Sequence, residues 1–381
     1  MRRVELVFFD AGGGHRSAAN ALQYMIRQKG LDWDVNLMNL QELLDSMDIF
    51  RKITGVRLQD LYNLLLKKGW TLGSPQLLAG MHLVIRVLHG QTVRMLREYW
   101  SNSRPDLVVS VIPNFNRALF QSLKLARPSV PLVTILTDMA DYPPHFWIEP
   151  RQDQHFICGT ARAVEQAIAL GHPADRVLRA SGMILSPRFY EIEAVDRTVE
   201  RRKLGLDPEL PTGILLFGGQ GSAVMEPIVR KLDASPLKLQ IIAVCGHNER
   251  LFQRLRALRT RFPLHTVGFT KEVPHFMQLS DFFIGKPGPG SISEAIFMKL
   301  PVIVVRNWWT LPQERYNADW VREQGVGVVV GSFEKEIAGA VEKMLDPVNL
   351  AAMRERVNAI DNRAIYEIPD MLGRILDQPY G

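Results

Sequence analysis

The segment from Lys286 to Ala295 has the residue types and spacing of a phosphate-binding loop. It reads Lys-Pro-Gly-Pro-Gly-Ser-Ile-Ser-Glu-Ala and lies between two apolar runs, residues 279–285 and 300–305. The runs predict two buried strands, and we expect a helix to open at Ser291 between them. A glycine-rich turn that leads into a helix presents unpaired N–H groups and the positive end of the helix dipole. The segment therefore predicts a phosphate or diphosphate site at the carboxyl edge of a parallel sheet.

The same segment also has a purely structural interpretation. Ser291 and Glu294 have the S-x-x-E spacing of a capping box, in which the two side chains only start a helix. Both interpretations remain open when the segment is considered alone.

Two further glycine-rich segments follow predicted strands. Residues 217–222 read Phe-Gly-Gly-Gln-Gly-Ser after an apolar run, and residues 12–15 read Gly-Gly-Gly-His after another. Neither matches G-x-G-x-x-G or the Walker sequence, so a dinucleotide enzyme or a P-loop ATPase is not indicated. Each segment alone can be an ordinary tight turn. Three of them, divided between two halves of the chain, are better explained by a ligand held in a cleft.

Polar side chains near these segments suggest how the rest of such a ligand is held. If residues 311–317 open a helix, Glu314 and Asn317 share one face with Gln313 adjacent, and such groups can hold sugar hydroxyls. His15 follows three glycines at an expected helix N-terminus, where the neutral form suited to a base or hydrogen-bond donor is favoured. The alternatives are an ordinary polar first turn and a structural histidine.

The elements that must position these residues are those of an α/β protein. Short β-type runs alternate with helical patterns in two successive series, at residues 4–9, 34–38, 107–112, 132–136 and 155–158, and then at 213–217, 239–244, 282–285, 302–305 and 326–330. This alternation implies parallel sheets, and two series imply two Rossmann-like domains with a cleft between their strand ends. We expect an N-terminal domain at residues 1–183, with a helical insertion at about residues 45–104, and a C-terminal domain at residues 184–345. A terminal helical segment, residues 346–381, is expected to pack back towards the N-terminal domain.

Composition narrows the class of protein and its partners. The chain has 381 residues, a net charge of +6 and two cysteines, Cys158 and Cys245, which suit a reducing compartment and offer no metal-binding spacing. We find no secretory signal and no apolar run long enough to predict a spanning helix. The positive charge favours phosphorylated ligands or an anionic membrane. Without a zinc spacing or an RNP-type motif, nucleic acid is not expected.

Residues 49–104 mix basic and large apolar side chains. The mixture predicts an amphipathic surface that could lie on an anionic bilayer. The alternative is a helical subdomain whose apolar face is buried in the N-terminal domain. The candidate membrane or acceptor residues in this segment are Lys67, Lys68, Trp70, Arg86 and Arg94.

Taken in order, the motifs resemble those of the monogalactosyldiacylglycerol synthase and processive diacylglycerol glucosyltransferase family, which belongs to glycosyltransferase family 28. The resemblance covers nearly the whole chain and rests on residues 11–19, 218–222, 245–248, 268–269, 286–295 and 313–317. It implies a GT-B fold, with two Rossmann-like domains whose parallel sheets face a central cleft. It also implies an inverting enzyme that moves glucose or galactose from a UDP-sugar to diacylglycerol or a related lipid, giving a β-glycosyl glycolipid.

The resemblance implies roles for individual residues. His15 would be the catalytic residue on the acceptor side, Glu294 would accept the ribose hydroxyls, and Phe269 would border the uracil. The other donor-binding positions would be Gly14, Gly219, Gln220, Gly221, Ser222, Gly246, Gly288, Pro289, Gly290, Ser291, Gln313, Glu314 and Asn317. No metal or other cofactor would be required, because helix N-termini can neutralise the departing UDP.

One departure from the family keeps other functions open. Asn39 follows the second predicted strand, where family members often carry an acidic residue, and an amide cannot act as a base. The alternatives are a UDP-sugar epimerase of GT-B-like fold and a non-catalytic binder of nucleotide-sugars or lipids. A lipid acceptor would place the protein peripherally on the cytoplasmic side of a membrane.

Overall fold

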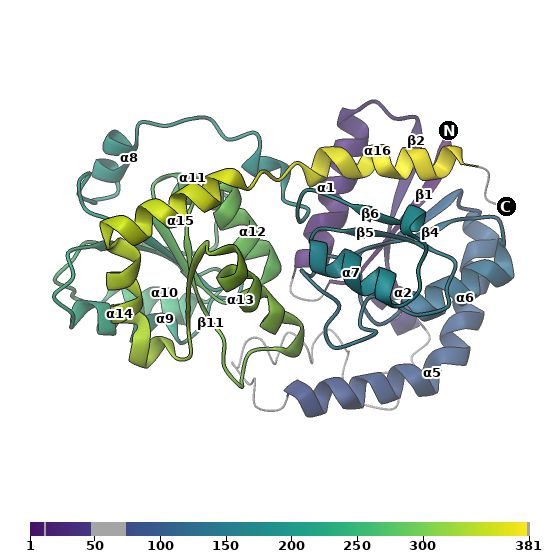
Figure 1. Cartoon of the computed structure of the whole chain (residues 1–381), viewed down its shortest axis with the longest axis horizontal. Coiled ribbons are helices and arrows are strands. Elements are labelled where there is room, and N and C mark those ends of the chain that lie inside the picture. Colours follow the sequence, from purple (N-terminus) through teal and green to yellow (C-terminus); the bar gives the residue numbers. More distant parts are fainter. Residues whose placement is uncertain (11–12, 47–73, 379–381) are drawn as a thin grey trace. The chain divides into compact units, whose positions relative to one another are not determined.

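The computed structural model describes residues 1–10, 13–46 and 74–378, and these form two compact α/β units (Figure 1). Unit 1 extends from the N-terminus to Pro187 and resumes at Asn362, whereas unit 2 extends from Arg188 to Asp361. Each unit contains a six-stranded sheet whose neighbouring strands are all parallel. The predicted pair of parallel-sheet domains is therefore confirmed.

Unit 1 is built on the sheet order β2-β1-β3-β4-β5-β6. Its strands are β1 Arg2–Phe8, β2 Trp33–Asn39, β3 Leu107–Ser110, β4 Leu132–Ile135, β5 His155–Cys158 and β6 Val177–Arg179. Its helices are α1 Gly14–Gln28, α2 Leu40–Ser46, α5 Ser74–Ser103, α6 Asn116–Ala126, α7 Ala161–Ala169 and α16 Ala364–Asp377, with 3-10 turns η1 Ala174–Arg176 and η2 Pro187–Phe189 near the end of its first segment.

Unit 2 is built on the sheet order β12-β11-β10-β7-β8-β9. Its strands are β7 Thr212–Leu216, β8 Gln240–Val244, β9 Leu264–Val267, β10 Phe282–Gly285, β11 Val302–Val305 and β12 Gly327–Val330. Its helices are α8 Arg197–Lys203, α9 Met225–Asp233, α10 Glu249–Arg256, α11 Val273–Gln278, α12 Pro289–Phe297, α13 Pro312–Gln324, α14 Phe333–Leu345 and α15 Pro347–Ala359. The terminal segment is thus divided, with α15 in unit 2 and α16 packed on α1 in unit 1.

The strands formed as expected where the sequence is continuously apolar. Strands β3, β4, β7, β8 and β10 are buried along their whole length, as strands covered by helices on both faces must be. The sequence did not predict β6 and β9. Both are edge strands with exposed or half-buried residues, and a strand with one neighbour needs no continuous apolar run.

The strand orders create a topological switch point in each sheet. In unit 2 the chain runs outward from β7 through β8 to β9, and returns to place β10 on the other side of β7. In unit 1 the corresponding neighbours are β1 and β3. At such points the loops leaving two adjacent strands diverge, and ligands of open α/β sheets bind there. The switch points are therefore the first places to look for chemistry.

Helix α5 shows how unit 1 uses the described part of the basic insertion. Leu96 and Trp100 are fully buried, and the Trp100 indole donates a 2.9 Å hydrogen bond to Ser122 of α6, which lies alongside α5. Arg86 and Arg94 are exposed on the same helix. This part of the insertion thus buries an apolar face in the core and keeps its basic side chains in water. Lys67, Lys68 and Trp70 lie outside the described residues.

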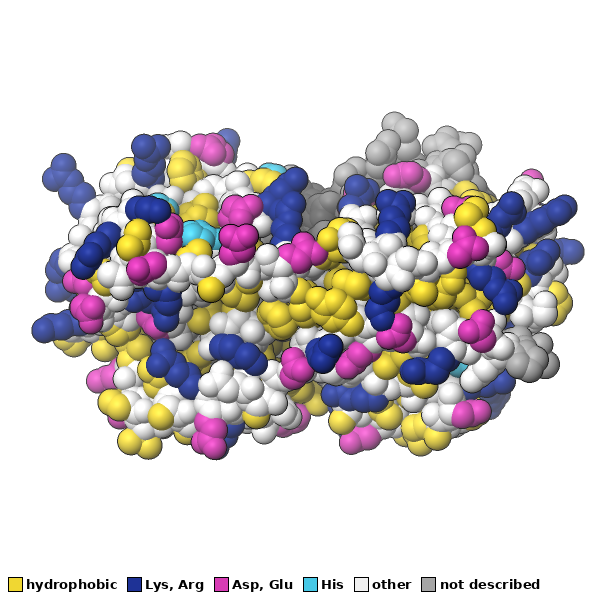
Figure 2. Space-filling view, turned by 90° about the horizontal axis from the view of Figure 1, so that it is seen from above, with side chains coloured by type: hydrophobic (Ala, Val, Ile, Leu, Met, Phe, Trp, Pro, Cys, Tyr) yellow, Lys and Arg dark blue, Asp and Glu magenta, His cyan; other side chains and the backbone are white. Residues whose placement is uncertain are grey.

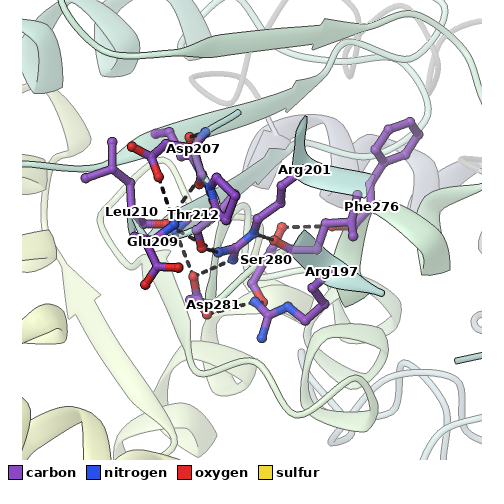
Figure 3. Close-up of polar contacts among 12 residues, drawn as sticks. Arg197, Arg201, Asp207, Glu209, Leu210, Thr212, Phe276, Ser280 and Asp281 are labelled. Atoms are coloured by element: carbon purple, nitrogen blue, oxygen red, sulfur yellow. Dashed lines mark hydrogen bonds and ion pairs between the residues drawn. The ribbon is translucent and has the colours of Figure 1, made fainter. Parts of the chain in front are cut away.

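A buried ion-pair cluster holds the amino edge of the second sheet (Figure 3). Asp281 precedes β10 and accepts hydrogen bonds from Arg201 at 2.7 Å, Arg197 at 2.9 Å and the Thr212 backbone N–H at 2.9 Å. Arg201 is 5% exposed and also donates to the carbonyl of Leu279. Burial raises the pKa of Asp281, but the hydrogen bonds and arginine charges outweigh burial and leave its pKa below the usual value. The cluster therefore ties α8 to β7 and β10.

We expect Asp281→Ala to lower the free energy of unfolding by about 3 kcal/mol, because it leaves the buried guanidinium of Arg201 unpaired. Since the pKa of Asp281 is lowered, the stabilisation is present at neutral pH and is lost as the pH falls through that pKa. Urea denaturation measures the effect. The control is Glu165→Ala, which breaks an exposed pair with Arg162 and should change stability by less than about 1 kcal/mol. Equal losses in both variants would contradict this account.

The face of the molecule seen in Figure 2 has no large patch of charge of one sign. Lysine and arginine side chains there are interspersed with acidic ones. The net charge of +6 is thus spread out on this face. Within residues 1–10, 13–46 and 74–378, no helix combines the length and apolar content needed to span a bilayer.

Candidate donor-binding and catalytic sites

Two glycine loops of unit 2 leave the strands at its switch point. The loop after β7 contains Gly218 and Gly221 with φ of 74° and 58°, which only glycine adopts without strain. Gly219 at its tip is exposed. Ser222 closes the loop, since its hydroxyl and its carbonyl accept the N–H groups of Val224 and Met225 at 3.4 Å and 3.1 Å. Together these residues bring bare backbone to the carboxyl edge of the sheet.

The loop after β8 supports the loop after β7 through backbone contacts. Gly246 has φ of 59°, and a Cβ there would lie 2.2 Å from the Gly219 carbonyl oxygen. The N–H of His247 donates to that same oxygen at 2.8 Å. A Cβ on Gly221 would likewise lie 2.4 Å from the Cys245 carbonyl oxygen. Glycine is required at these positions by close approach, so the two loops form one backbone unit.

The second switch-point loop corrects one sequence interpretation. Helix α12 begins at Pro289, with Gly288 as its N-cap and no side-chain cap, so the helix does not open at Ser291. Ser291 lies inside the first turn and Glu294 in the second, and the capping-box interpretation is therefore wrong. Because Pro289 has no N–H and no side chain caps the turn, the N–H groups of Gly290 and Ser291 are available to an anion.

Lys286 lies between these two glycine loops. A Cβ on Gly218 would be 3.6 Å from its Cε, and a Cβ on Gly288 would be 3.3 Å from it. Its ammonium group forms a 3.2 Å ion pair with Glu314, which is 9% exposed. The sequence alone predicted no role for Lys286, although a lysine directly after a buried strand and before Pro-Gly is a usable signal. The structure thus places Lys286 beside the backbone of both glycine loops.

Helix α13 supplies the polar groups beside this lysine. It begins at Pro312, so Gln313 and Glu314 lie in its first turn as expected. Asn317 is fully buried, and its side-chain amide donates to the Pro287 carbonyl at 2.8 Å. Its Oδ1 atom has no hydrogen-bond partner among the described residues. This arrangement fixes the loop before α12 and leaves a buried acceptor unsatisfied.

Glu294 differs from the other carboxylates of this unit. Burial raises its pKa from 4.5 to about 7. No hydrogen bond or ion pair holds its carboxyl group within the described part of the chain. A half-buried acid without a partner is costly unless a ligand satisfies it. Its place on α12, one turn beyond the free N–H groups, is consistent with a contact to a sugar hydroxyl.

An exposed aromatic pair lies at the ends of β8 and β9. His247 and Phe269 stack with ring centroids 3.8 Å apart and an interplanar angle of 17°. Phe269 is 56% exposed, so one face of the pair is open to solvent. A flat base could stack there. Through Gly219, His247 also links this pair to the glycine loop after β7.

In unit 1, His15 lies at the other switch point. It is the second residue of α1, directly after Gly14, and α1 has no side-chain cap. Its Nδ1 lies 3.2 Å from the Thr137 hydroxyl after β4, and its ring also bonds the Val111 backbone after β3. Burial lowers the pKa of His15 to about 4, and the Val111 bond opposes the shift. The imidazole is thus neutral at pH 7.

The surroundings of His15 include residues that the sequence analysis did not identify. The buried Trp147 ring lies 6.1 Å from the imidazole, and its indole N–H donates to Asp138 at 2.9 Å. Asp141 fixes the same loop by accepting the N–H of Trp147 at 2.6 Å. No carboxylate contacts His15 itself among the described residues. These residues follow one buried strand, but the sequence does not reveal which helix they face.

Asn39 has a local structural role. The side-chain Oδ1 of Asn39 accepts the backbone N–H of Gln41 at 3.2 Å, and its side-chain amide group donates to the Glu42 carboxylate at 2.8 Å. These bonds organise the start of α2. Asn39 therefore uses both polar atoms of its side chain within its own turn, and its candidate place at an acceptor site stays a prediction.

Sequence comparison shows which known proteins this chain resembles. The glycosyltransferase family 28 C-terminal domain matches residues 213–366. The chain is also 27% identical over 394 residues to the probable monogalactosyldiacylglycerol synthase 2, chloroplastic, of Oryza sativa subsp. japonica, covering 99% of this chain and 81% of that protein.

Two solved structures have the same fold. MurG of Acinetobacter baumannii superposes with a TM-score of 0.64 at 13% identity, covering 98% of this chain and 100% of that chain. The S. aureus MnaA–UDP co-structure gives a TM-score of 0.63 at 15% identity, with coverage of 99% and 97%. The expected GT-B fold is therefore confirmed. At these identities the likeness concerns the fold alone.

Proposed function

We propose that this chain is a family 28 glycosyltransferase, related to the monogalactosyldiacylglycerol synthases, that transfers glucose or galactose from a UDP-sugar to diacylglycerol or a related membrane lipid. The observation that carries the proposal is the position of Lys286 between two glycine loops at the switch point of unit 2. A cation flanked by free backbone N–H groups suits a diphosphate that must leave as an anion.

The remaining groups of unit 2 suit the other parts of a UDP-sugar. The stacked pair of His247 and Phe269 offers an aromatic face to the uracil. The carboxyl of Glu294, which has no partner among the described residues, suits the ribose hydroxyls. Gln313 and Glu314 on α13 suit the hexose. Solved neighbours include the MnaA–UDP co-structure, which supports a uridine nucleotide as the donor carrier.

His15 is proposed as the catalytic residue on the acceptor side. We assign the ring proton to Nδ1, which lies 3.2 Å from the Thr137 hydroxyl, so that Nε2 keeps its lone pair and can accept the proton of a lipid hydroxyl. The hydroxyl oxygen then forms the bond to the anomeric carbon as the bond to UDP breaks. Attack from the face opposite the leaving group gives the β-glycoside by inversion. The proton remains on His15 until product release, and the backbone N–H groups with Lys286 hold the UDP anion.

The experiment that tests this proposal measures UDP release by the purified protein. A panel of UDP-sugars is supplied with and without diacylglycerol in anionic mixed micelles. We expect release that depends on the lipid, with labelled hexose appearing in the organic phase. UDP binding without release under any pairing would contradict the proposal, and release or isomerisation of the sugar without lipid would favour the UDP-sugar epimerase.

Glu294 gives a pH-dependent prediction. The ribose should bond the carboxylate more strongly than the acid, so UDP affinity should rise as the pH rises through about 7. The stability of the ligand-free protein should change in the opposite direction. The folded acid keeps its proton at pH values between 4.5 and about 7, so its stabilising contribution is present below 4.5 and is lost as the pH rises through 7.

Glu294→Gln should remove both trends, because glutamine does not titrate, and should weaken UDP binding by about tenfold. Calorimetric titration with UDP and urea denaturation, each on wild type and variant on both sides of neutral pH, give the two readouts. Unchanged UDP affinity would show that Glu294 has only a structural role in α12.

A lipid acceptor implies that the protein works at a membrane surface. Unit 1 offers exposed Arg86 and Arg94 on α5, and the remaining basic residues expected there lie outside the described ranges. We propose a peripheral association with an anionic bilayer, on its cytoplasmic side. The proposal requires neither a metal nor another cofactor.

A further inference from the structure

Two adjacent tryptophans are exposed in the loop between β11 and α13. Trp308 is 76% exposed and Trp309 is 41% exposed. A tryptophan side chain buries a large apolar area when it finds a partner, so leaving two of them in water is costly. A contiguous exposed apolar site of this kind usually marks a binding surface. Neither tryptophan belongs to the glycine loops or to the polar groups proposed to hold the donor.

Hydrogen bonds of Asn307 hold the backbone of the loop that carries the pair. Asn307 accepts the Trp309 N–H at 2.9 Å, donates its own N–H to the Thr310 hydroxyl at 3.0 Å, and donates its side-chain amide to the Gly331 carbonyl at 3.0 Å. Three bonds from one asparagine hold both ends of the turn and fasten it to the end of β12. The backbone of the turn is therefore ordered before any contact is made, which lowers the entropy cost of binding.

Arg315 joins the turn to the candidate donor site. Its guanidinium lies 5.6 Å from the centre of the Trp308 ring and donates to the carbonyls of Trp308 and Thr310 at 3.1 Å and 3.2 Å. Arg315 also follows Gln313 and Glu314 directly on α13, which lies beside β11 in Figure 1. Arg315 thus links the turn to the helix that carries the proposed sugar-binding residues.

We propose that the turn formed by Trp308 and Trp309 is a membrane contact of unit 2, inserting into the interfacial layer of an anionic bilayer. Indole rings prefer this layer, because one part of the ring is apolar and its N–H can reach water or headgroups. Arg315 at the ring suits lipid phosphates. The inference rests on the proposed function for the lipid acceptor, and it places the donor-binding edge of unit 2 next to the surface that holds that acceptor.

A hexose of the donor is the competing occupant of the Trp308 ring. Trp308 as a residue is 76% exposed, and the Arg315 guanidinium already lies over its ring. A sugar bound there would leave most of the indole in water, whereas a bilayer interface would cover both tryptophans together. The observations therefore favour the lipid surface.

The test measures vesicle binding by the full chain without turnover, using phosphatidylcholine vesicles with and without phosphatidylglycerol. Substituting both residues, Trp308→Ser and Trp309→Ser, should weaken binding to the anionic vesicles about tenfold or more, because two aromatic anchors are lost. UDP affinity should stay within about twofold, since no donor group is removed. The control is Val348→Ser, which removes a 77% exposed apolar side chain elsewhere in unit 2 and should change neither quantity.

A second measurement locates the ring. Brominated acyl chains should quench the intrinsic fluorescence of wild type more than that of Trp308→Phe. The inference would be overturned if the double variant bound vesicles as wild type does, or if wild type did not bind vesicles at all. A variant that lost only UDP-sugar affinity would also overturn it. Vesicle binding through the pair without any hexose transfer would instead contradict the proposed function and leave the membrane contact standing.

Discussion

Replacing His15 by alanine is expected to slow hexose transfer about 100- to 10,000-fold, the usual contribution of a positioned general base. The UDP affinity of the same variant should change by less than about threefold, because no donor-binding group of unit 2 is removed. Transfer is measured as labelled hexose in the organic phase, and UDP affinity by calorimetric titration. Equal losses of transfer and UDP affinity would contradict the assigned role.

The pH profile separates a base from a residue that only supports the fold. With a pKa of about 4, His15 stays unprotonated through the mildly acidic range, so the acid limb of the transfer rate should lie near pH 4 instead of the ordinary histidine value of 6.5. Thr137→Asp would place a carboxylate beside Nδ1, and should move that limb upward by stabilising the imidazolium. A limb that stays in place in Thr137→Asp would argue against a base at this position.

Lys286→Met is expected to weaken UDP binding about 10- to 100-fold, the range for losing a hydrogen-bonded charge at a diphosphate. Uridine, which has no phosphates, should bind wild type and variant alike. Both affinities can be measured by calorimetric titration. The variant also releases Glu314 from its ion pair, so Glu314→Gln is needed beside it to separate the two effects.

The matched control for the lysine is Lys343→Met, which removes an exposed ammonium group on α14 of the same unit. It should bind UDP as wild type does. If Lys286→Met weakened uridine and UDP to the same extent, the lysine would be supporting the loops and not the diphosphate. If neither affinity changed, the diphosphate would have to lie elsewhere on the unit.

The sequence predicted what local patterns can specify. Continuous apolar runs predicted β3, β4, β7, β8 and β10, because parallel strands that are buried on both faces contain few polar residues. Clusters of glycine residues predicted the loops that follow β7 and β10. The start of α12 was misplaced by two residues, because Ser291 and Glu294 imitate a capping box while Gly288 and Pro289 begin the helix.

Properties that depend on distant parts of the chain were not visible. Strand order decides that the loops after β7 and β10 are neighbours, and only then does Lys286 acquire a position between them. In unit 1, the pairing of Thr137 with His15 joins residues 122 positions apart. The buried Asp281 cluster is similar, since its arginines are about 80 residues away along the chain. These are tertiary contacts, for which no short-range spacing rule exists.

The backbone contact between Gly219 and Gly246 has a thermodynamic consequence. Because the two loops touch without intervening side chains, the loop after β7 cannot shift without carrying the loop after β8 and the His247–Phe269 pair with it. Any ligand fragment that orders one loop thereby prepares the other. The affinities for a diphosphate and for a base would then be linked reciprocally, so that each half of a nucleotide strengthens the binding of the other half by the same factor.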